Sequence, residues 1–187
     1  MKLTIITLFA FVAVPLVQAR AELKEVNLPL AVQNAVTRNY DLGRSVGDAG
    51  GISSLRVFKN EKLTTFQIVY NILADQNSLA GEIGISACRP FGLVECTRKV
   101  VERSDEVQAN FQFVNLESFI DTMMTWEFEE ADWIQSLVTI ERYAQSVLGA
   151  GAKSYAYGYD EVADVFTVIM ISKDKKTVLV FTGDYGA

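Results

Sequence analysis

The segment from Trp126 to Trp133 carries the side chains best suited to acid–base chemistry. It places Glu127, Glu129 and Glu130 between two tryptophans that are seven positions apart, so that both indoles would share one helix face. Paired carboxyl groups beside aromatic platforms are what a glycosidase uses, one as acid and one as base or nucleophile. The alternative is a solvated acidic helix start, which the helix dipole stabilises and which we favour. A carboxylate-dependent hydrolase is therefore our third hypothesis.

Other catalytic and metal chemistries have few side chains to work with. The chain contains no histidine, which excludes His-dependent serine and cysteine triads and His-ligated zinc and copper sites. The acidic segments lack the alternating Asp-x-Asp pattern of a calcium loop. The glycine-rich stretch 41–54 lacks the Lys-Ser/Thr of a phosphate-binding loop. We expect no cofactor and no metal, and we favour a non-enzymatic protein over an enzyme.

The two cysteines, Cys88 and Cys96, are separated by seven residues. Two thiols cannot complete a zinc site, the redox spacing Cys-x-x-Cys is absent, and no histidine is available to generate a thiolate. The flanking segments 81–87 and 95–101 have the pattern of extended chain, with turn residues between them. We predict a structural disulfide between Cys88 and Cys96 that closes a wide β-hairpin, as is common in exported proteins.

Three tyrosines alternate along one predicted strand. Tyr155, Tyr157 and Tyr159 share a face, with small residues on the other. A tyrosine ring is apolar with a polar tip, which suits an interface or a half-wet concavity. Packing in the core is the alternative, because strands favour aromatic residues in any case. Our leading hypothesis is a binding or interaction module, such as an inhibitor or envelope accessory protein; the second is a carrier of apolar small molecules.

The first 21 residues have the three-part pattern of a secretory signal peptide. Lys2 precedes an apolar run from Leu3 to Val17, and Ala19-Arg20-Ala21 forms a cleavage site. This run is too short for a comfortable membrane span, and no later stretch approaches the roughly 20 apolar residues a span requires. We expect a soluble, exported product, periplasmic or secreted, with one globular domain at 22–187.

The chain is acidic, which bears on its partners. It has 17 Lys and Arg against 23 Asp and Glu, a net charge of −6, and loss of Lys2 and Arg20 with the signal would bring it to −8. Nucleic-acid binders cluster basic residues against phosphates. The basic pair Arg98-Lys99 lies near Glu102 and is of mixed charge. We therefore expect a protein or apolar small-molecule partner and no nucleic acid.

The elements that must position these residues follow two hydrophobic periods. A helix is expected from Pro29 to about Tyr40. Period-two patterns then predict a five-strand antiparallel meander that includes 55–58, 66–72, both arms of the cysteine hairpin and 107–114. Helical stripes at 116–123 and 133–147 predict one bent helix or a helix pair, ending at Gly149.

Three more strands are expected after the helices, at 154–159, 165–171 and 177–181. The last two form a hairpin that is apolar on both faces, which predicts a central position with helices on one face and another cover on the second. An oligomer through these C-terminal strands is one such cover. The fold class is therefore α+β: a curved antiparallel sheet of about eight strands on a long central helix or helix pair, plus a short N-terminal helix.

Overall fold

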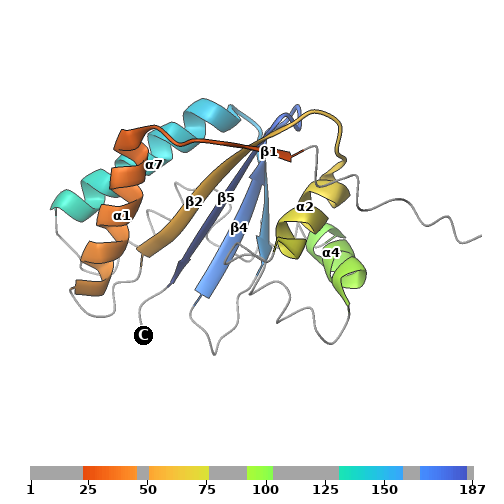
Figure 1. Ribbon diagram of the computed structural model, residues 1–187, viewed down its shortest axis with the longest axis horizontal. Coiled ribbons are helices and arrows are strands. Elements are labelled where there is room, and N and C mark those ends of the chain that lie inside the picture. The colour runs from red at the N-terminus through yellow and green to blue at the C-terminus, as the bar shows by residue number, and fades with distance from the viewer. Residues whose placement is uncertain (1–22, 46–50, 76–91, 103–130, 158–164, 185–187) are drawn as a thin grey trace, which may run out of the picture.

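The computed structural model describes residues 23–45, 51–75, 92–102, 131–157 and 165–184 (Figure 1). The five strands of this part form one antiparallel sheet in the order β1-β2-β5-β4-β3. The α+β class is thus confirmed. The elements in chain order are β1 (Leu23–Val26), α1 (Leu30–Ser45), β2 (Gly51–Asn60), α2 (Thr65–Ala74), α4 (Leu93–Glu102), α7 (Ala131–Leu148), β3 (Lys153–Tyr157), β4 (Val165–Ile171) and β5 (Thr177–Asp184).

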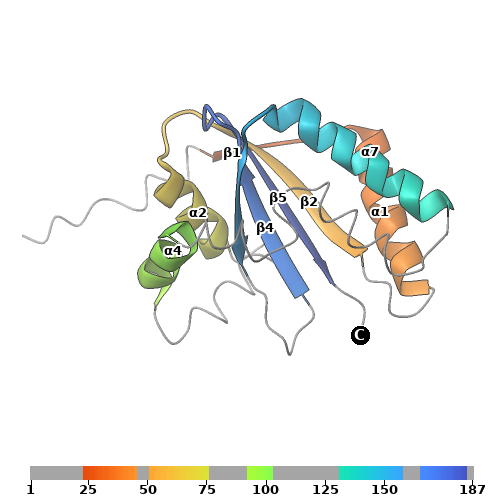
Figure 2. The ribbon, with the colours of Figure 1, turned by 180° about the vertical axis from the view of Figure 1, so that it is seen from behind.

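The sheet lies between two pairs of helices. Helices α1 and α7 cover one face, and α2 and α4 cover the other, as the views from the two sides show (Figures 1 and 2). On β5, Leu179 and Phe181 pack under α1 and α7, while Val178 and Val180 pack under α2 and α4. Successive strand side chains point to opposite faces, so a strand covered on both sides must be apolar on both. This explains the pattern of the C-terminal hairpin.

The central position of that hairpin is confirmed. Strand β5 lies between β2 and β4, and β4 lies between β5 and β3. Neither strand has a free edge on which another copy of the chain could pair. The cover on the second face is the helix pair α2 and α4, whose segments the sequence pattern had assigned to strands.

The expected strand at 66–72 is wrong, because this segment is helix α2. Thr64 and Gln67 form a capping box: the Gln67 amide donates to Thr64 Oγ1 over 3.3 Å, and the Thr64 amide donates to Gln67 Oε1 over 2.9 Å. Ile68 and Ile72, four residues apart, are both buried. Their spacing fits period two and a helix turn equally well, and the cap decides between them.

The expected strand at 95–101 is also wrong, because it lies within α4. Cys96 and Val100 lie one turn apart and are buried, and Thr97 donates its hydroxyl to the Leu93 carbonyl oxygen over 2.7 Å. Cys96 is therefore on a helix and not on the arm of a hairpin. Cys88 lies outside the described residues, so its pairing with Cys96 stays a prediction.

The expected eight strands and strong curvature are not confirmed. The described part has five strands and not eight, and its sheet is not strongly curled (Figure 1). The predicted strands at 81–87 and 107–114, and the predicted helical segment at 116–123, lie outside the described residues. The helices expected at 29–40 and 133–147 are present, but α1 is longer than the short helix predicted and extends beyond Tyr40 to Ser45. Helix α7 buries most of the predicted stripe and ends before Gly149, whose φ is 68°.

Candidate functional site

The structure places only some of the residues that the sequence pattern favoured. Trp133 is fully buried, in the core between α7 and the sheet, so it is no sugar platform. Asp132, in the first turn of α7, pairs with Arg38 of α1. Several predicted site residues lie outside the described residues. They are the three candidate catalytic carboxylates, one disulfide cysteine and one tyrosine of the binding surface: Glu127, Glu129, Glu130, Cys88 and Tyr159.

Tyr155 lies in the interior. Its side chain is only 5% exposed and packs in the core beneath α2 and α4, in a row with Ile169 and Val180 on the neighbouring strands. For Tyr155 the structure therefore favours core packing over an exposed binding surface. The side chain of Tyr157 is not among those described.

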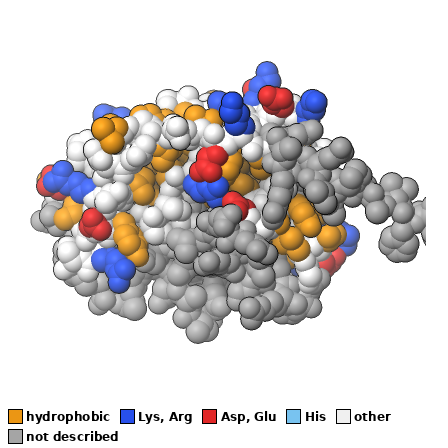
Figure 3. Space-filling view, viewed as in Figure 1, with side chains coloured by type: hydrophobic (Ala, Val, Ile, Leu, Met, Phe, Trp, Pro, Cys, Tyr) orange, Lys and Arg blue, Asp and Glu red, His pale blue; other side chains and the backbone are white. Residues whose placement is uncertain are grey.

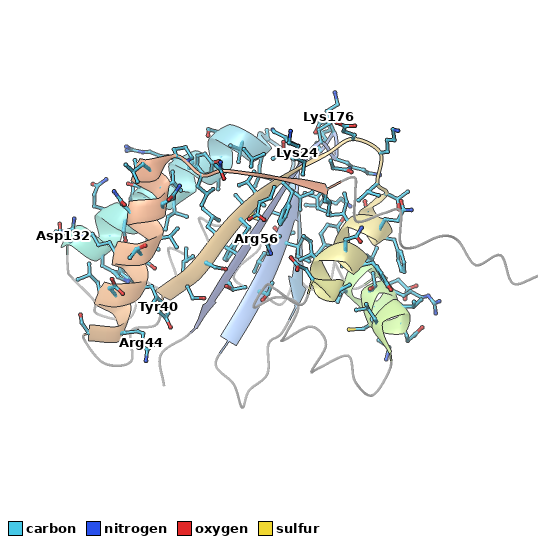
Figure 4. The ribbon with its side chains drawn as sticks, in the orientation of Figure 1. Lys24, Tyr40, Arg44, Arg56, Asp132 and Lys176 are labelled. Atoms are coloured by element: carbon cyan, nitrogen blue, oxygen red, sulfur yellow. The ribbon has the colours of Figure 1, made fainter. Side chains whose placement is uncertain are left out.

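A lysine-rich end is the most distinctive surface of the described residues. It lies where β1 and β3 begin and β2 and β4 end, around the β4–β5 turn (Figures 3 and 4). Seven of the nine lysines of the chain gather here, and all seven are exposed. They are Lys24, Lys59, Lys62, Lys153, Lys173, Lys175 and Lys176.

Strand pairing brings these lysines together from distant parts of the sequence. Lys24 on β1 lies directly opposite Lys59 on β2, and Lys59 lies opposite Thr177 on β5. The Lys59 ammonium donates to Thr177 Oγ1 over 3.0 Å. On the other side of the turn, the Lys173 side chain lies against Gly151, two residues before Lys153. One continuous end of the sheet therefore carries the whole group.

No lysine of this end forms an ion pair in the described part of the chain, although the charge of Lys176 contributes to lowering the pKa of Asp174. All four ion pairs there use arginine. The nearby acids by sequence are Glu25, Glu61 and Asp174, and Glu25 pairs with Arg56. Asp174 accepts from the Lys176 backbone amide over 3.0 Å and from the Ser172 hydroxyl over 2.7 Å, and these hydrogen bonds lower its pKa. Asp174 therefore serves the turn, and the lysine ammonium groups face solvent.

The turn itself contains a strained lysine. Lys175 has φ 61°, in the left-handed region that Gly and Asn adopt more readily. Its backbone amide donates to the Ser172 carbonyl oxygen over 2.8 Å, which closes the turn. A long cationic side chain thus occupies a position where the backbone conformation favours glycine.

A second charged group lies on the face that α2 and α4 cover. Arg56 on β2 forms a two-pronged ion pair with Glu25 on β1: Nε donates to Oε1 over 2.9 Å and Nη2 to Oε2 over 2.6 Å (Figure 4). Nη1 donates to Asp75 Oδ2, just after α2, over 2.7 Å. The guanidinium carbon lies 4.8 Å from the centre of the Phe58 ring, within cation–π range.

The Arg56 group holds its charge. The hydrogen bond from Arg56 lowers the pKa of Glu25, against a smaller opposing effect of burial. The hydrogen bond to Glu25, followed by that to Asp75, raises the pKa of Arg56. A carboxylate with a lowered pKa is a poor proton donor at neutral pH. The group fastens β1 and the end of α2 to β2, and we assign it a structural role.

Beyond Arg56 on the same sheet face lies a row of hydroxyl groups. Thr182 Oγ1 is 2.6 Å from Ser54 Oγ and 3.1 Å from Ser53 Oγ, because a bulge in β2 places two serines beside one threonine. Thr167 lies next to Thr182 on β4. Thr167 is fully buried, and its hydroxyl has no hydrogen-bond partner in the described part of the protein. A hydroxyl nucleophile needs an adjacent base, and Ser53, Ser54 and Thr182 contact one another through their hydroxyl groups.

A buried amide joins the two helices of the other face to the sheet. Asn39 of α1 is fully buried; its Nδ2 donates to Ser136 Oγ on α7 over 3.1 Å, and its Oδ1 accepts from the Ile52 amide over 2.8 Å. A Cβ on Gly51 would lie 3.1 Å from both the carbonyl and the side-chain oxygen of Asn39. This close approach favours glycine at the start of β2. The arrangement is a structural joint, with its polar groups satisfied internally.

The chain matches no protein-family model, no curated protein and no solved structure. Across the described ranges, no three or more Cys, Asp or Glu side chains are grouped so that they could hold a metal ion. Within the same ranges, no helix has the length and apolar character needed to span a bilayer. The lysine-rich end is the surface of the described residues that the sequence pattern did not predict.

Proposed function

We propose that this protein is an exported, non-enzymatic binding protein that contacts an anionic partner through its lysine-rich end. One observation carries the proposal: seven exposed lysines from separate segments share one end of the sheet, and the ion pairs of the described residues use none of them. Surface charges on a folded protein are usually of mixed sign. The lysines of this end outnumber the nearby acids Glu25, Glu61 and Asp174, and this local excess of positive charge in an acidic chain suggests recognition by charge.

The net negative charge of the whole chain does not oppose this contact. At physiological ionic strength, charges are screened over about 8 Å, so an approaching surface responds mainly to the groups nearest to it. A partner that meets the lysine-rich end responds to those lysines more than to the acidic residues elsewhere. The sum over the molecule, −6, governs solubility more than it governs local binding.

The other charged groups support a binding role over an enzymatic one. Arg56, Glu25 and Asp75 fasten secondary-structure elements together, and Arg38 pairs with Asp132 between two helices. These groups are engaged in ion pairs and their arrangement resembles no acid–base pair. The hydrolase and carrier hypotheses rest on residues or spaces that the described part does not include, and they stay predictions.

Retention on a sulfated polysaccharide column tests the binding surface. We expect the variant K173Q/K175Q/K176Q to elute at clearly lower salt than the wild type. The matched control R38Q/R44Q/R98Q removes the same charge from exposed helix positions, and it should elute close to the wild type. Equal shifts for the two variants would show that net charge alone governs retention, and would refute the proposed surface.

Export and the disulfide are part of the same proposal and have their own measurement. The purified protein should begin at Glu22, and intact mass spectrometry should show no alkylation until a reductant is added. Reduction should then expose two thiols, at Cys88 and Cys96. An uncleaved chain whose cysteines react without reductant would refute this part of the proposal.

A further inference from the structure

We infer that the anionic partner of the lysine-rich end is the headgroup surface of a bilayer containing anionic phospholipids. The inference rests on the proposed function and narrows it to one partner. Three features of this end support a lipid surface: its shape, its use of lysine in place of arginine, and the charge repulsion and backbone strain found at some of these lysines.

The shape fits a broad surface better than a small anion. The lysines come from the ends of three strands, the segment after β2 and the turn between β4 and β5, and Lys24 and Lys176 lie at the same end of the molecule (Figure 4). In the space-filling view, basic side chains project from the outline along this end (Figure 3). A site for a single phosphate would bring its donors together around one point. Separate, exposed ammonium groups instead suit a plane of many negative charges.

The residue type also discriminates between partners. Arginine has a planar fork that binds one phosphate or one guanine through two hydrogen bonds, and it is enriched where phosphopeptides or bases are read. Lysine is a hydrated point charge on a flexible stem. The lysine-rich end contains seven lysines, whereas Arg38 and Arg98 form ion pairs on helices and Arg56, farther along β2, is engaged by Glu25 and Asp75. The composition therefore favours attraction to a diffuse negative field.

Two of the local features of this end destabilise the folded protein. Lys24 and Lys59 lie directly opposite each other on neighbouring strands, where like charges repel. Lys175 occupies a left-handed backbone position. Strain retained at one surface is a reason to look for function there. A negatively charged surface would neutralise the repulsion and so offset part of this cost.

The expected contact is peripheral and reversible. A lysine close to an anionic bilayer increases partitioning by about fivefold, so removing three should reduce it about 100-fold. The contact should also weaken steeply with salt, because the screening length falls from about 10 Å at 0.1 M to about 3 Å at 1 M. No bilayer-spanning segment is needed for such binding.

Vesicle co-sedimentation tests the inference. The probe is a phosphatidylcholine vesicle with about 30% phosphatidylglycerol, compared with a pure phosphatidylcholine vesicle. We expect protein purified from cells expressing the full chain to bind only the anionic vesicle, and to be released by about 1 M salt. K173Q/K175Q/K176Q should bind about 100-fold more weakly, and R38Q/R44Q/R98Q should bind like the wild type.

A second variant keeps the inference testable if the first variant does not fold. K62Q/K153Q removes two exposed lysines from other segments, and it should lower partitioning about 25-fold. Equal binding to both vesicles, or unchanged binding by both lysine variants, would overturn the inference. Tighter binding to a short DNA duplex than to anionic vesicles would overturn it as well.

The two proposals fail in different ways. Lysine-dependent retention on the polysaccharide column without vesicle binding would reject the lipid surface and leave the anion-binding surface intact. Loss of both would reject the proposed function together with the inference.

Discussion

Replacement of Asn39 by alanine should be among the most damaging single changes in the described core. The Asn39 side chain accepts from the Ile52 amide and donates to Ser136 Oγ, and it thereby joins α1 to both β2 and α7. All three residues are buried, with Asn39 and Ile52 fully so. Water therefore cannot readily replace the lost partner. Ser136 keeps one hydrogen bond, which it donates to the Trp133 carbonyl oxygen over 2.5 Å.

The size of the effect follows from three contributions. A buried backbone amide left without an acceptor costs about 1–3 kcal/mol. The space left by the amide group adds about 1 kcal/mol, for a small cavity of roughly 40 Å³. Alanine is the better helix former and returns up to about 0.7 kcal/mol. The free energy of unfolding should therefore fall by about 2 kcal/mol, which lowers the melting temperature by about 4–8 °C in a domain of this size.

Asn34 offers a matched control on the same helix. It is exposed, so Asn34→Ala makes the same chemical change and the same gain in helix propensity without touching the joint. Urea unfolding can be followed by the fluorescence of the buried Trp133. We expect Asn39→Ala to be about 3 kcal/mol less stable than Asn34→Ala, with similar slopes against urea. A difference below about 0.5 kcal/mol would refute the reasoning that Asn39 carries this joint.

The remaining predictions concern three other local features. Gly51→Ala should lower the free energy of unfolding by about 1–3 kcal/mol, because its Cβ would lie 3.1 Å from Asn39, and Asn39→Ala should relieve part of this cost. Arg56→Gln should lower the free energy of unfolding, because it removes the ion pair that lowers the pKa of Glu25. This half-exposed pair contributes about 1 kcal/mol at a pH above the unfolded pKa of Glu25, about 4.3. The contribution disappears as the pH falls through the lower pKa of the folded state. Lys175→Gly should raise the melting temperature, with a gain of about 0.5–1 kcal/mol, because its φ of 61° suits glycine.

Each of these has a direct control. For Gly51, the double-mutant cycle with Asn39 is informative, since strictly additive losses would contradict the contact. For Arg56, unfolding measured near pH 7 and below pH 4 should show the difference between wild type and variant shrinking in acid; a constant difference would contradict the linkage. For Lys175, the neighbouring Lys176→Gly removes the same charge without relieving a positive φ, and an equal gain there would point to charge and not to strain.

Long, regular patterns in the sequence predicted their elements correctly. The stripe of α7 from Trp133 to Ala144 repeats over several turns, and the C-terminal hairpin is apolar on both faces over most of the part next to its turn. In such segments many residues agree on one period. Each additional turn or pair of residues makes the alternative period less consistent with the pattern, so local sequence decides the structure.

The short segment of α2 shows where such patterns fail. Ile68 and Ile72 are separated by four residues, which is both two strand repeats and one helix turn. The capping box of Thr64 and Gln67 is a local signal for the helix, and it was present in the sequence to be read. At α4, Cys96 and Val100 have the same four-residue spacing, and burial of Thr97 beside Cys96 is compatible with a helix face and not with one strand face.

The sequence by itself determined the α+β class, the two long helices and the hairpin, because these depend on contacts between residues close along the chain. Only the tertiary structure decided that helices cover both faces of the sheet and that β1 pairs with β2, which brings Glu25 to Arg56 and Lys24 to Lys59. The lysine-rich end is also a feature that the tertiary structure decided. Its lysines are spread from residue 24 to residue 176, and strand register, which no local pattern encodes, places them at one end.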